Sequence, residues 1–233
     1  MQMGIGACSP SQARESRPGS PGVSGPHLTS RRRPVPAYEL LMYAGFNGLD
    51  PAGGSLLSDA RVVIGCHGTR LDRATEIIET GRFTPSKNDY DWLGHGIYFW
   101  EYAPLRAWQW AKERNDADAA VVEAQIELGY CLDLTDIQFT ENVRTAYEGL
   151  REAYARTGEA LPVNRGKLRY LDCFVINYLC GFILPHCDTV RAPFLEGNPI
   201  YDGSALLTQS HVQLVVRNDA CIRLPLRALF KEE

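Results

Sequence analysis

The stretch CHGTRLDRATEIIETGRFTPSKNDYDWLGHGIYF, residues 66–99, decides how this chain folds. It follows the β-branched run RVVIG at 61–65, a pattern typical of a buried strand. Apolar residues recur at helical spacing over 71–80, and Gly81 stands where a helix commonly ends. The pattern predicts a strand that leads directly into a helix.

The second half of this stretch predicts a loop and then another strand and helix. Residues 82–95 contain the Pro, Ser, Asn and Asp of an irregular loop. GIYFW at 96–100 has the composition of a short strand, and PLRAWQWAKER at 104–114 that of a helix. Pro104 suits the first turn of that helix, because its missing N–H has no partner there in any case.

The rest of the chain predicts further strands separated by helices. A long strand is expected over 119–135, and SHVQLVVR at 210–217 predicts another, with CIRLPL as its continuation. Two helices are expected between these strands, over 143–157 and 167–183.

The domain organisation follows from composition. Residues 1–36 are rich in Ser, Pro, Gly and Arg and contain few large apolar side chains, a composition typical of disorder. We therefore expect a disordered leader over 1–36 and one α+β domain over 37–233. A helical insert is expected at about 136–190.

Charge and hydropathy exclude some classes of partner. The net charge is −4, and residues after the leader hold 19 of the 24 basic but 27 of the 28 acidic side chains. Such an acidic domain disfavours salt-dependent binding of a nucleic-acid duplex. A local groove for a single strand or for a nucleic-acid end stays compatible with this charge. No run of about 18 apolar residues and no secretion signal occur, so a cytoplasmic protein without a membrane partner is expected.

The seven cysteines predict reduced thiols. Their number is odd and no CxxC occurs, which argues against a disulfide framework and against a zinc site. Cys173, Cys180 and Cys187 recur every seven residues, and burial of cysteine in an apolar helix explains that spacing. We expect no metal.

His67 and Gly68 end the first strand, at the margin of the expected sheet. Glycine lets a ligand approach the backbone closely, and the Gly68 amide and carbonyl suit a flat carboxamide. The alternative for His67 is a structural histidine bonded to a nearby carbonyl.

Gly94, Gly96 and Tyr98 stand at the junction of the loop with the second strand. Tyr98 projects to the same face as Gly96, because side chains in a strand alternate. A tyrosine beside space cleared by glycines predicts a stacking platform. The alternatives are a core aromatic residue and a glycine pair that only forms a turn.

These motifs, in this order and within 34 residues, resemble those of the poly(ADP-ribose) polymerase-type ADP-ribosyltransferases. That family carries a His-Gly-Ser/Thr motif at a strand end, a donor loop, and a Gly-x-Gly-Ile/Leu-Tyr-Phe motif before a helix. EAQIELG at 123–129 resembles the strand that follows in the family, and HVQLVVRNDACI at 211–222 resembles its closing strand. The resemblance covers about three fifths of the residues after the leader.

The resemblance implies an ADP-ribosyltransferase-like split β-sheet core with a cleft for NAD. ADP-ribose would pass from NAD to an acceptor, and nicotinamide would leave through an oxocarbenium-like transition state. His67 would bind a ribose hydroxyl, the Gly68 backbone would bind the carboxamide, and Tyr98 would stack on the nicotinamide ring.

Other residues of the same motifs are expected to border NAD. Thr69 completes the first motif, and Gly96 belongs to the second. Residues 84–92 would form the donor loop. The resemblance implies NAD as the co-substrate and implies no metal.

Two positions on the following helix depart from the family. The serine that helps to bind the carboxamide falls at Arg106, and the second stacking tyrosine falls at Gln109, between Trp108 and Trp110. One of these tryptophans would supply the second ring face. The alternative is a packed helix with a solvated arginine.

The third catalytic position departs most. The family's glutamate falls at Gln213, and His211 lies two residues earlier on the same strand face, so either side chain is a candidate. Glutamine accepts a hydrogen bond but lacks the charge and basicity of a carboxylate. Transfer of a single unit is therefore expected rather than polymer elongation.

Three functions stay open at this point. The first is a mono-ADP-ribosyltransferase with a protein or nucleic-acid acceptor. The second is a binding module for NAD or ADP-ribose-modified targets, and the third is an NAD glycohydrolase or toxin-like effector. The insert would shape the acceptor site, dock a partner or cover a sheet face, whereas Glu101 and Glu141 are conceivable acids for which a surface position is the default.

Overall fold

The computed structural model describes residues 56 and 58–229, so the expected leader lies outside the described residues. The domain is α+β, as predicted. Its elements in chain order are β1 (Ser58–Arg70), α2 (Leu71–Thr80), β2 (Ile97–Glu101), α3 (Pro104–Asn115), β3 (Ala119–Asp133), α4 (Ile137–Thr157), α5 (Tyr170–Tyr178), a π-helical turn (Leu179–Ile183), β4 (Thr189–Phe194), β5 (His211–Val216) and β6 (Ile222–Leu229).

The strand–helix–loop–strand–helix order predicted for the first part of the domain is confirmed. Helix α2 ends at Gly81, which is left-handed with φ 70° and donates its N–H to the Ile77 carbonyl at 2.8 Å. Glycine adopts this conformation without a steric penalty, which explains the stop. Helix α3 begins at Pro104, as its sequence indicated.

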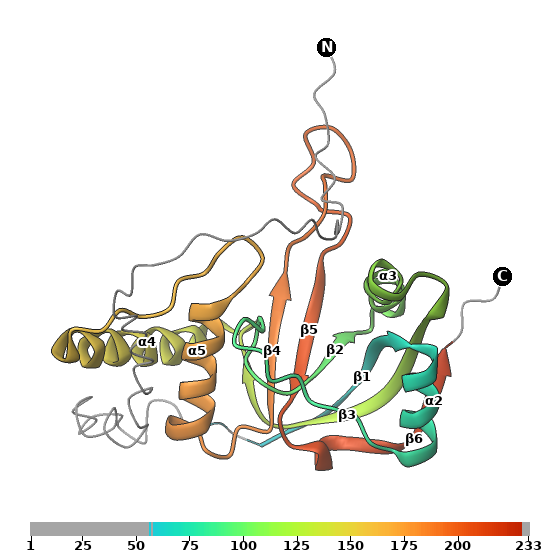
Figure 1. Ribbon diagram of the computed structural model, residues 1–233, viewed down its shortest axis with the longest axis horizontal. Helices are drawn as coiled ribbons and strands as arrows, with labels where there is room; N and C mark the ends of the chain where they lie inside the picture. Colours follow the sequence, from blue (N-terminus) through green and yellow to red (C-terminus); the bar gives the residue numbers. More distant parts are fainter. Residues whose placement is uncertain (1–55, 57, 230–233) are drawn as a thin grey trace, which may run out of the picture. The chain divides into compact units, whose positions relative to one another are not determined.

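The sheet closes into a small barrel (Figure 1). Its strands follow the order β1-β2-β5-β4-β3, and β3 pairs in turn with β1, while β6 adds to β3. Strands β3 and β4 are parallel, and the other neighbours are antiparallel. Figure 1 shows α2 and α3 at one end of the sheet and α4 and α5 at the other.

The barrel closes unevenly. Strand β1 pairs with β3 along most of its length, but with β2 at only two positions, Gly65 with Glu101 and Cys66 with Trp100. On the other side, β3 pairs with β4 only through residues 131–133. A half formed by β1, β3 and β6 therefore meets a half formed by β2, β5 and β4 at two short joints.

Apolar side chains fill the barrel. Phe99, Ile126, Leu128 and Leu214 are fully buried and pack together inside it. Because side chains alternate along each strand, the residues beside them in sequence face outward, where Trp100 packs near α3. Strand β2 thus serves two environments: Trp100 faces outward, whereas Phe99 faces the interior and packs against the His67 ring.

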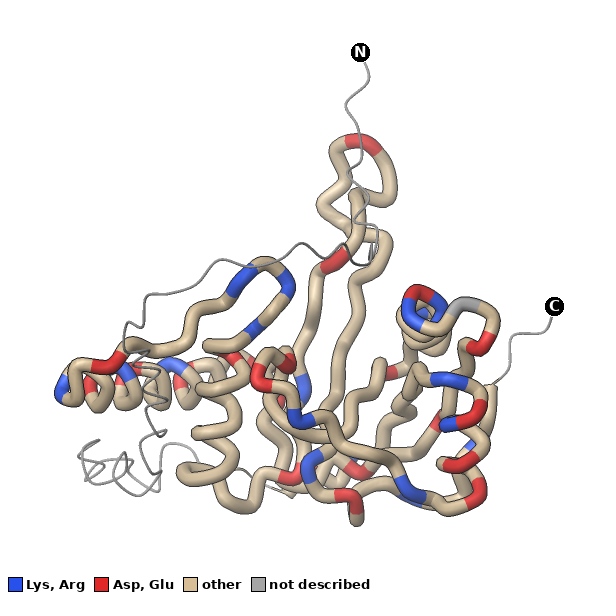
Figure 2. Tube along the Cα trace, viewed as in Figure 1, with Lys and Arg blue, Asp and Glu red and all other residues tan. Residues whose placement is uncertain are grey.

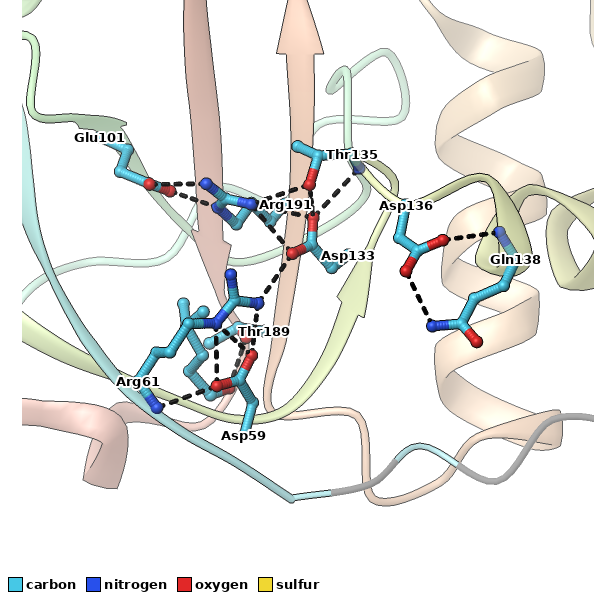
Figure 3. Close-up of polar contacts among 10 residues, drawn as sticks. Asp59, Arg61, Glu101, Asp133, Thr135, Asp136, Gln138, Thr189 and Arg191 are labelled. Atoms are coloured by element: carbon cyan, nitrogen blue, oxygen red, sulfur yellow. Dashed lines mark hydrogen bonds and ion pairs between the residues drawn. The ribbon is translucent and has the colours of Figure 1, made fainter.

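A chain of charged side chains links four strands of the barrel (Figure 3). Arg191 on β4 donates from Nη2 to Glu101 Oε1 at 2.7 Å and from Nη1 to Asp133 Oδ2 at 2.9 Å. Arg61 on β1 donates to the same Asp133 oxygen at 2.9 Å. Burial raises the pKa of Asp133, but hydrogen bonds from Thr135 and Arg61 outweigh this and leave the pKa lowered. The Asp133 carboxylate therefore stays charged and paired.

The surface position expected for Glu101 is wrong. Its side chain is only 7% exposed and faces Arg191, which is 13% exposed. Glu141, in contrast, lies on the surface of α4 as expected, beside Arg144. Figure 2 shows acidic and basic residues interspersed along α2, α3 and α4.

The end of the chain differs from the prediction in two ways. Residues 189–194 form the strand β4, which begins at the end of the expected insert and continues into a stretch for which no element was predicted. The segment after β5 is also not a continuation of it, because a 3-10 turn at 219–221 redirects the chain and β6 pairs with β3. The helical insert itself is present, and α4 starts at Ile137 because the Asp136 side chain caps it by accepting from the Gln138 amide at 3.0 Å.

Three further properties bear on function. No helix within the described residues is long and apolar enough to cross a membrane. The same residues contain no cluster of three side chains suited to a metal ion. The described cysteines, residues 66, 131, 173, 180, 187 and 221, are all buried and free, and Cys8 lies outside the described part.

We expect Glu101→Ala to lower the free energy of unfolding by about 3 kcal/mol, because Arg191 would keep a buried charge without its main partner. Urea denaturation followed by fluorescence measures this change. Glu141→Ala is the matched control, because it removes an exposed carboxylate from an exposed pair and should leave the midpoint nearly unchanged. Equal midpoints for the two variants would contradict the role given to the buried pair.

Candidate functional site

His67 lies where β1 separates from β2. Its Nδ1 is 2.8 Å from the Tyr98 carbonyl, and because a carbonyl only accepts, Nδ1 carries the proton. Burial lowers the pKa of His67, which favours the neutral ring. The ring packs against Phe83 and Phe99, with centroids 5.2 and 5.6 Å away. Nε2 makes no hydrogen bond within the described residues, so an acceptor lone pair is available there.

Gly68 follows at the unpaired edge of β1. The Tyr102 amide donates to the Ile64 carbonyl at 2.9 Å, so Ile64 directs its peptide groups toward β2. Peptide groups alternate in direction along an antiparallel strand, so those of Gly68 point the same way. Because the register of β1 with β2 ends at Cys66, Gly68 presents its N–H and C=O at an edge that β2 no longer covers.

The lack of a side chain at Gly68 has a packing reason. A Cβ there would lie 2.3 Å from the Ala107 carbonyl oxygen of α3. Glycine is thus required at this position by the close approach of α3. Any recognition by Gly68 therefore runs through its peptide groups.

Tyr98 clamps the turn that precedes it. Its hydroxyl donates to the Gly94 carbonyl at 2.7 Å and accepts from the Leu93 amide at 2.9 Å. Burial raises the pKa of this hydroxyl, so it remains protonated and keeps both bonds. The hydroxyl therefore has a structural task, and any contact with a ligand belongs to the ring.

The space beside the two glycines of this turn is filled by protein. A Cβ on Gly96 would lie 2.5 Å from Val215 Cγ1, and one on Gly94 would lie 2.7 Å from Asn177 Oδ1. Gly94 also has φ 78°, which favours glycine. Side chains of β5 and α5 thus occupy the space that was expected to be open beside Tyr98. The alternative prediction, a glycine pair that only forms a turn, accounts for both glycines.

The helical insert holds the loop expected to cover NAD. The Tyr90 carbonyl accepts from the Arg169 amide at 3.2 Å, and Trp92 donates its indole N–H to the Lys167 carbonyl at 2.8 Å. Asn177 on α5 accepts from the His95 amide at 2.9 Å. The insert therefore sets the position of residues 84–95.

A second group of polar residues lies on the outer face of β2 and β5, and we name it the α3–β5 cluster. It consists of Trp100, Arg106, His211 and Gln213. Each has a buried polar atom with no hydrogen-bond partner in the described chain: Trp100 Nε1, Arg106 Nε and Nη1, His211 Nε2 and Gln213 Oε1. Buried polar atoms normally have partners, so such a concentration indicates a place for a polar ligand.

Strand register explains how the cluster forms. Gln213 is directly opposite Trp100, so both side chains share a face, and Tyr98 lies diagonally from Gln213 on that face. The Arg106 guanidinium lies over the Trp100 ring, 5.8 Å from its centroid. The centroid of the His211 ring is 6.4 Å from that of Trp100.

The charge of Arg106 is matched locally. Its Nη2 donates to Glu196 Oε2 at 2.9 Å, and the two side chains are 13% and 17% exposed. Arg106, which aligns with a serine of the family that the sequence resembles, is therefore one partner of a nearly buried ion pair. Nε and Nη1 remain as donors for a ligand.

His211 is neutral by the same reasoning as His67. Burial is the largest cause of the lowered pKa of His211, and the Arg106 charge lowers this pKa further. The hydrogen bond to the Gln209 carbonyl and the charge of Glu196 oppose the shift. Nδ1 lies 2.7 Å from that carbonyl and so donates to it. The free lone pair is on Nε2.

The remaining predicted residues lie at the edges of these two groups. Thr69 is half-buried and pairs with Ala120 on β3. Trp110 packs near Trp100 with ring centroids 5.4 Å apart, and the Arg114 guanidinium lies 4.4 Å from the centroid of the Trp110 ring, so Trp110 already has protein neighbours.

Sequence reasoning missed three members of the site. Trp100 closes the GIYFW pattern and resembles an ordinary core residue. Phe194 stacks on His211 at 5.9 Å and 22°, and Glu196 pairs with Arg106, yet both come from a segment without periodicity. The sequence signal for Glu196 is the arginine at position 106, because an arginine that is buried needs an acidic partner.

We expect Tyr98→Phe to lower the free energy of unfolding by about 1 kcal/mol and to speed amide exchange at Leu93, because that N–H loses its acceptor. Hydrogen exchange followed by NMR measures both. Tyr102→Phe, at a residue 62% exposed, serves as control and should change neither. Unchanged exchange at Leu93 would show that the hydroxyl does not hold the turn.

Comparison with known proteins adds one partial similarity. No family model matches the chain. An uncharacterized protein from Methanocaldococcus jannaschii is 37% identical over an alignment of 79 residues, and the match covers 31% of this chain and 37% of that protein. The chain therefore matches little more than a third of that relative's length, and the relative's description states no activity.

Proposed function

We propose that this protein transfers a single ADP-ribose unit from NAD to an acceptor and releases nicotinamide. The observation that carries the proposal is the separation of β1 from β2 after Cys66, which leaves His67 Nε2 without a partner among the described residues and the Gly68 peptide groups at an edge beyond the register with β2. A histidine acceptor beside a paired amide and carbonyl matches the ribose and carboxamide of NAD in chemical type.

The carboxamide of nicotinamide offers one acceptor and two donors. The Gly68 N–H donates to its oxygen and the Gly68 C=O accepts from its nitrogen, a flat two-point contact. His67 Nε2 accepts from a ribose hydroxyl, while Nδ1 keeps the ring in place through Tyr98. The two half-sheets, which meet at two short joints, support the split-sheet architecture that this arrangement requires.

Gln213 is the residue that we assign to the other side of the ribose. Its Oε1 is buried and has no hydrogen-bond partner in the described part of the chain, and Gln213 lies diagonally from Tyr98 on the outer face. An amide oxygen orients a hydroxyl by accepting its hydrogen bond but does not carry charge to a cationic transition state. Catalysis then rests on orientation of the donor, which suits one transfer per acceptor.

Glu101 does not supply the missing carboxylate. It lies on β2 next to Trp100, but it faces the barrel interior, where Arg191 holds it. Among the described carboxylates, Glu196 is the one adjacent to the α3–β5 cluster, and Arg106 occupies it. The neutral Gln213 also favours a second candidate function, a module that binds NAD without transfer.

A cytoplasmic location fits the proposal. The six described cysteines are free and buried, as in a reducing compartment, and NAD is supplied there.

Nicotinamide release from NAD by the full-length chain, with and without cell lysate, tests the proposal. We expect release that rises with lysate, and a loss of about 10²-fold in His67→Ala, because the donor ribose loses its orienting acceptor. His186→Ala is the matched control at an exposed histidine. Lysate-independent release would instead identify an NAD glycohydrolase, and NAD binding without release would identify a binding module.

A further inference from the structure

His211 is held in one orientation and one tautomer. Nδ1 donates to the Gln209 carbonyl at 2.7 Å, and the Phe194 ring lies parallel to the imidazole at 5.9 Å and 22°. The side chain is only 9% exposed. Nε2 consequently presents a fixed lone pair that is buried and has no partner in the described chain. A base oriented by a second group is a recurring arrangement for proton transfer.

The position of His211 along β5 places it beyond the donor ribose. Val215 is opposite Tyr98, Gln213 is opposite Trp100, and His211 is one step further along the same face. Successive residues on one face of a strand are about 7 Å apart. If Gln213 binds the donor ribose, as proposed above, the next position along the strand borders the incoming acceptor.

The charges around His211 favour an uncharged acceptor. Arg106 from α3 and Glu196 from the segment after β4 are the charged groups that face it, and they neutralise each other at 2.9 Å. Gln213 carries no charge and accepts no proton. An anionic acceptor would find no net positive charge here, whereas an uncharged one needs a base to remove its proton.

We propose that His211 is the general base for an acceptor that attacks through a hydroxyl group. This inference rests on the proposed ADP-ribosyl transfer. The hydroxyl oxygen forms a bond to C1 of the ribose while the bond from C1 to the nicotinamide nitrogen breaks. The electron pair of the broken bond neutralises the pyridinium, so nicotinamide leaves uncharged, and the hydroxyl proton passes to His211 Nε2.

Two small nucleophiles test this step with the full-length protein. Methanol is a hydroxyl probe that must lose a proton, and its product is the methyl glycoside of ADP-ribose. Azide is an anionic probe that needs no base. Mass spectrometry measures both products against nicotinamide released.

The variant is His211→Asn, because the asparagine amide can still donate to the Gln209 carbonyl but has no proton-accepting nitrogen. We expect the methanol product to fall by about 10²-fold and the azide product to stay within about threefold of wild type. His186→Asn is the matched control and should leave both products unchanged.

The pH dependence gives an independent measurement. The base acts only when neutral, so methanol transfer by the wild type should fall as the pH drops through the lowered pKa of His211. His67 must also stay neutral to accept from the donor ribose and its pKa is lowered too, so its titration affects methanol and azide transfer alike. The part of the acid limb that appears with methanol but not with azide is assigned to His211, and it should be absent in His211→Asn.

The outcomes separate the two proposals. Equal methanol transfer by wild type and His211→Asn would overturn the base role while leaving ADP-ribosyl transfer intact. An equal loss of methanol and azide products would also overturn it, because it would show a structural role. No nicotinamide release by the wild type with any nucleophile would overturn the proposed function, and the inference with it.

Discussion

The separation of β1 from β2 after Cys66 is the constraint on which the candidate site depends. Up to that point the two strands exchange hydrogen bonds, and beyond it β1 continues along β3 while β2 continues along β5. His67 stands at the divergence and replaces a strand hydrogen bond with a side-chain bond to the Tyr98 carbonyl. The edge of β1 at Gly68 is therefore not paired with β2, although the barrel stays closed.

The barrel separates stabilising charges from the α3–β5 cluster. Glu101 and Trp100 are neighbours in β2, yet alternation sends one to the interior with Arg191 and the other outward toward Arg106. The interior charges are fully paired among strands, as buried charges must be. Outside, several polar atoms lack partners. Among the described residues, most of the buried polar atoms without partners therefore lie in this cluster, and the Tyr178 hydroxyl on α5 is the exception.

Much of the first half of the fold was predictable because its signals are local. A β-branched run, helical spacing closed by Gly81, and Pro104 at a helix start each act within a few residues. Strand β4 was missed because its inward side chain is Arg191, which breaks the apolar alternation, and because Pro193 argues against a strand. The burial of Glu101 was equally hidden, since its partner lies 90 residues away in sequence.

The candidate site was predictable only in part for the same reason. His67, Tyr98 and Gln213 come from strands with recognisable patterns, and the structure brings them to adjoining strands. The tasks of the glycines were not predictable, because Val215 and Asn177, which fill the space beside them, belong to distant elements. Glu196 likewise became identifiable only through its contact with Arg106.

The bonds between the helical insert and residues 84–95 have a consequence for how this fold can be varied. Lys167, Arg169 and Asn177 each hold that loop through a hydrogen bond, two of them through backbone atoms on the insert side. Side-chain divergence in the insert is therefore tolerable where the backbone path is kept, whereas a change of path displaces the loop. The two segments form one module, to be inherited or transplanted together despite their separation in the chain.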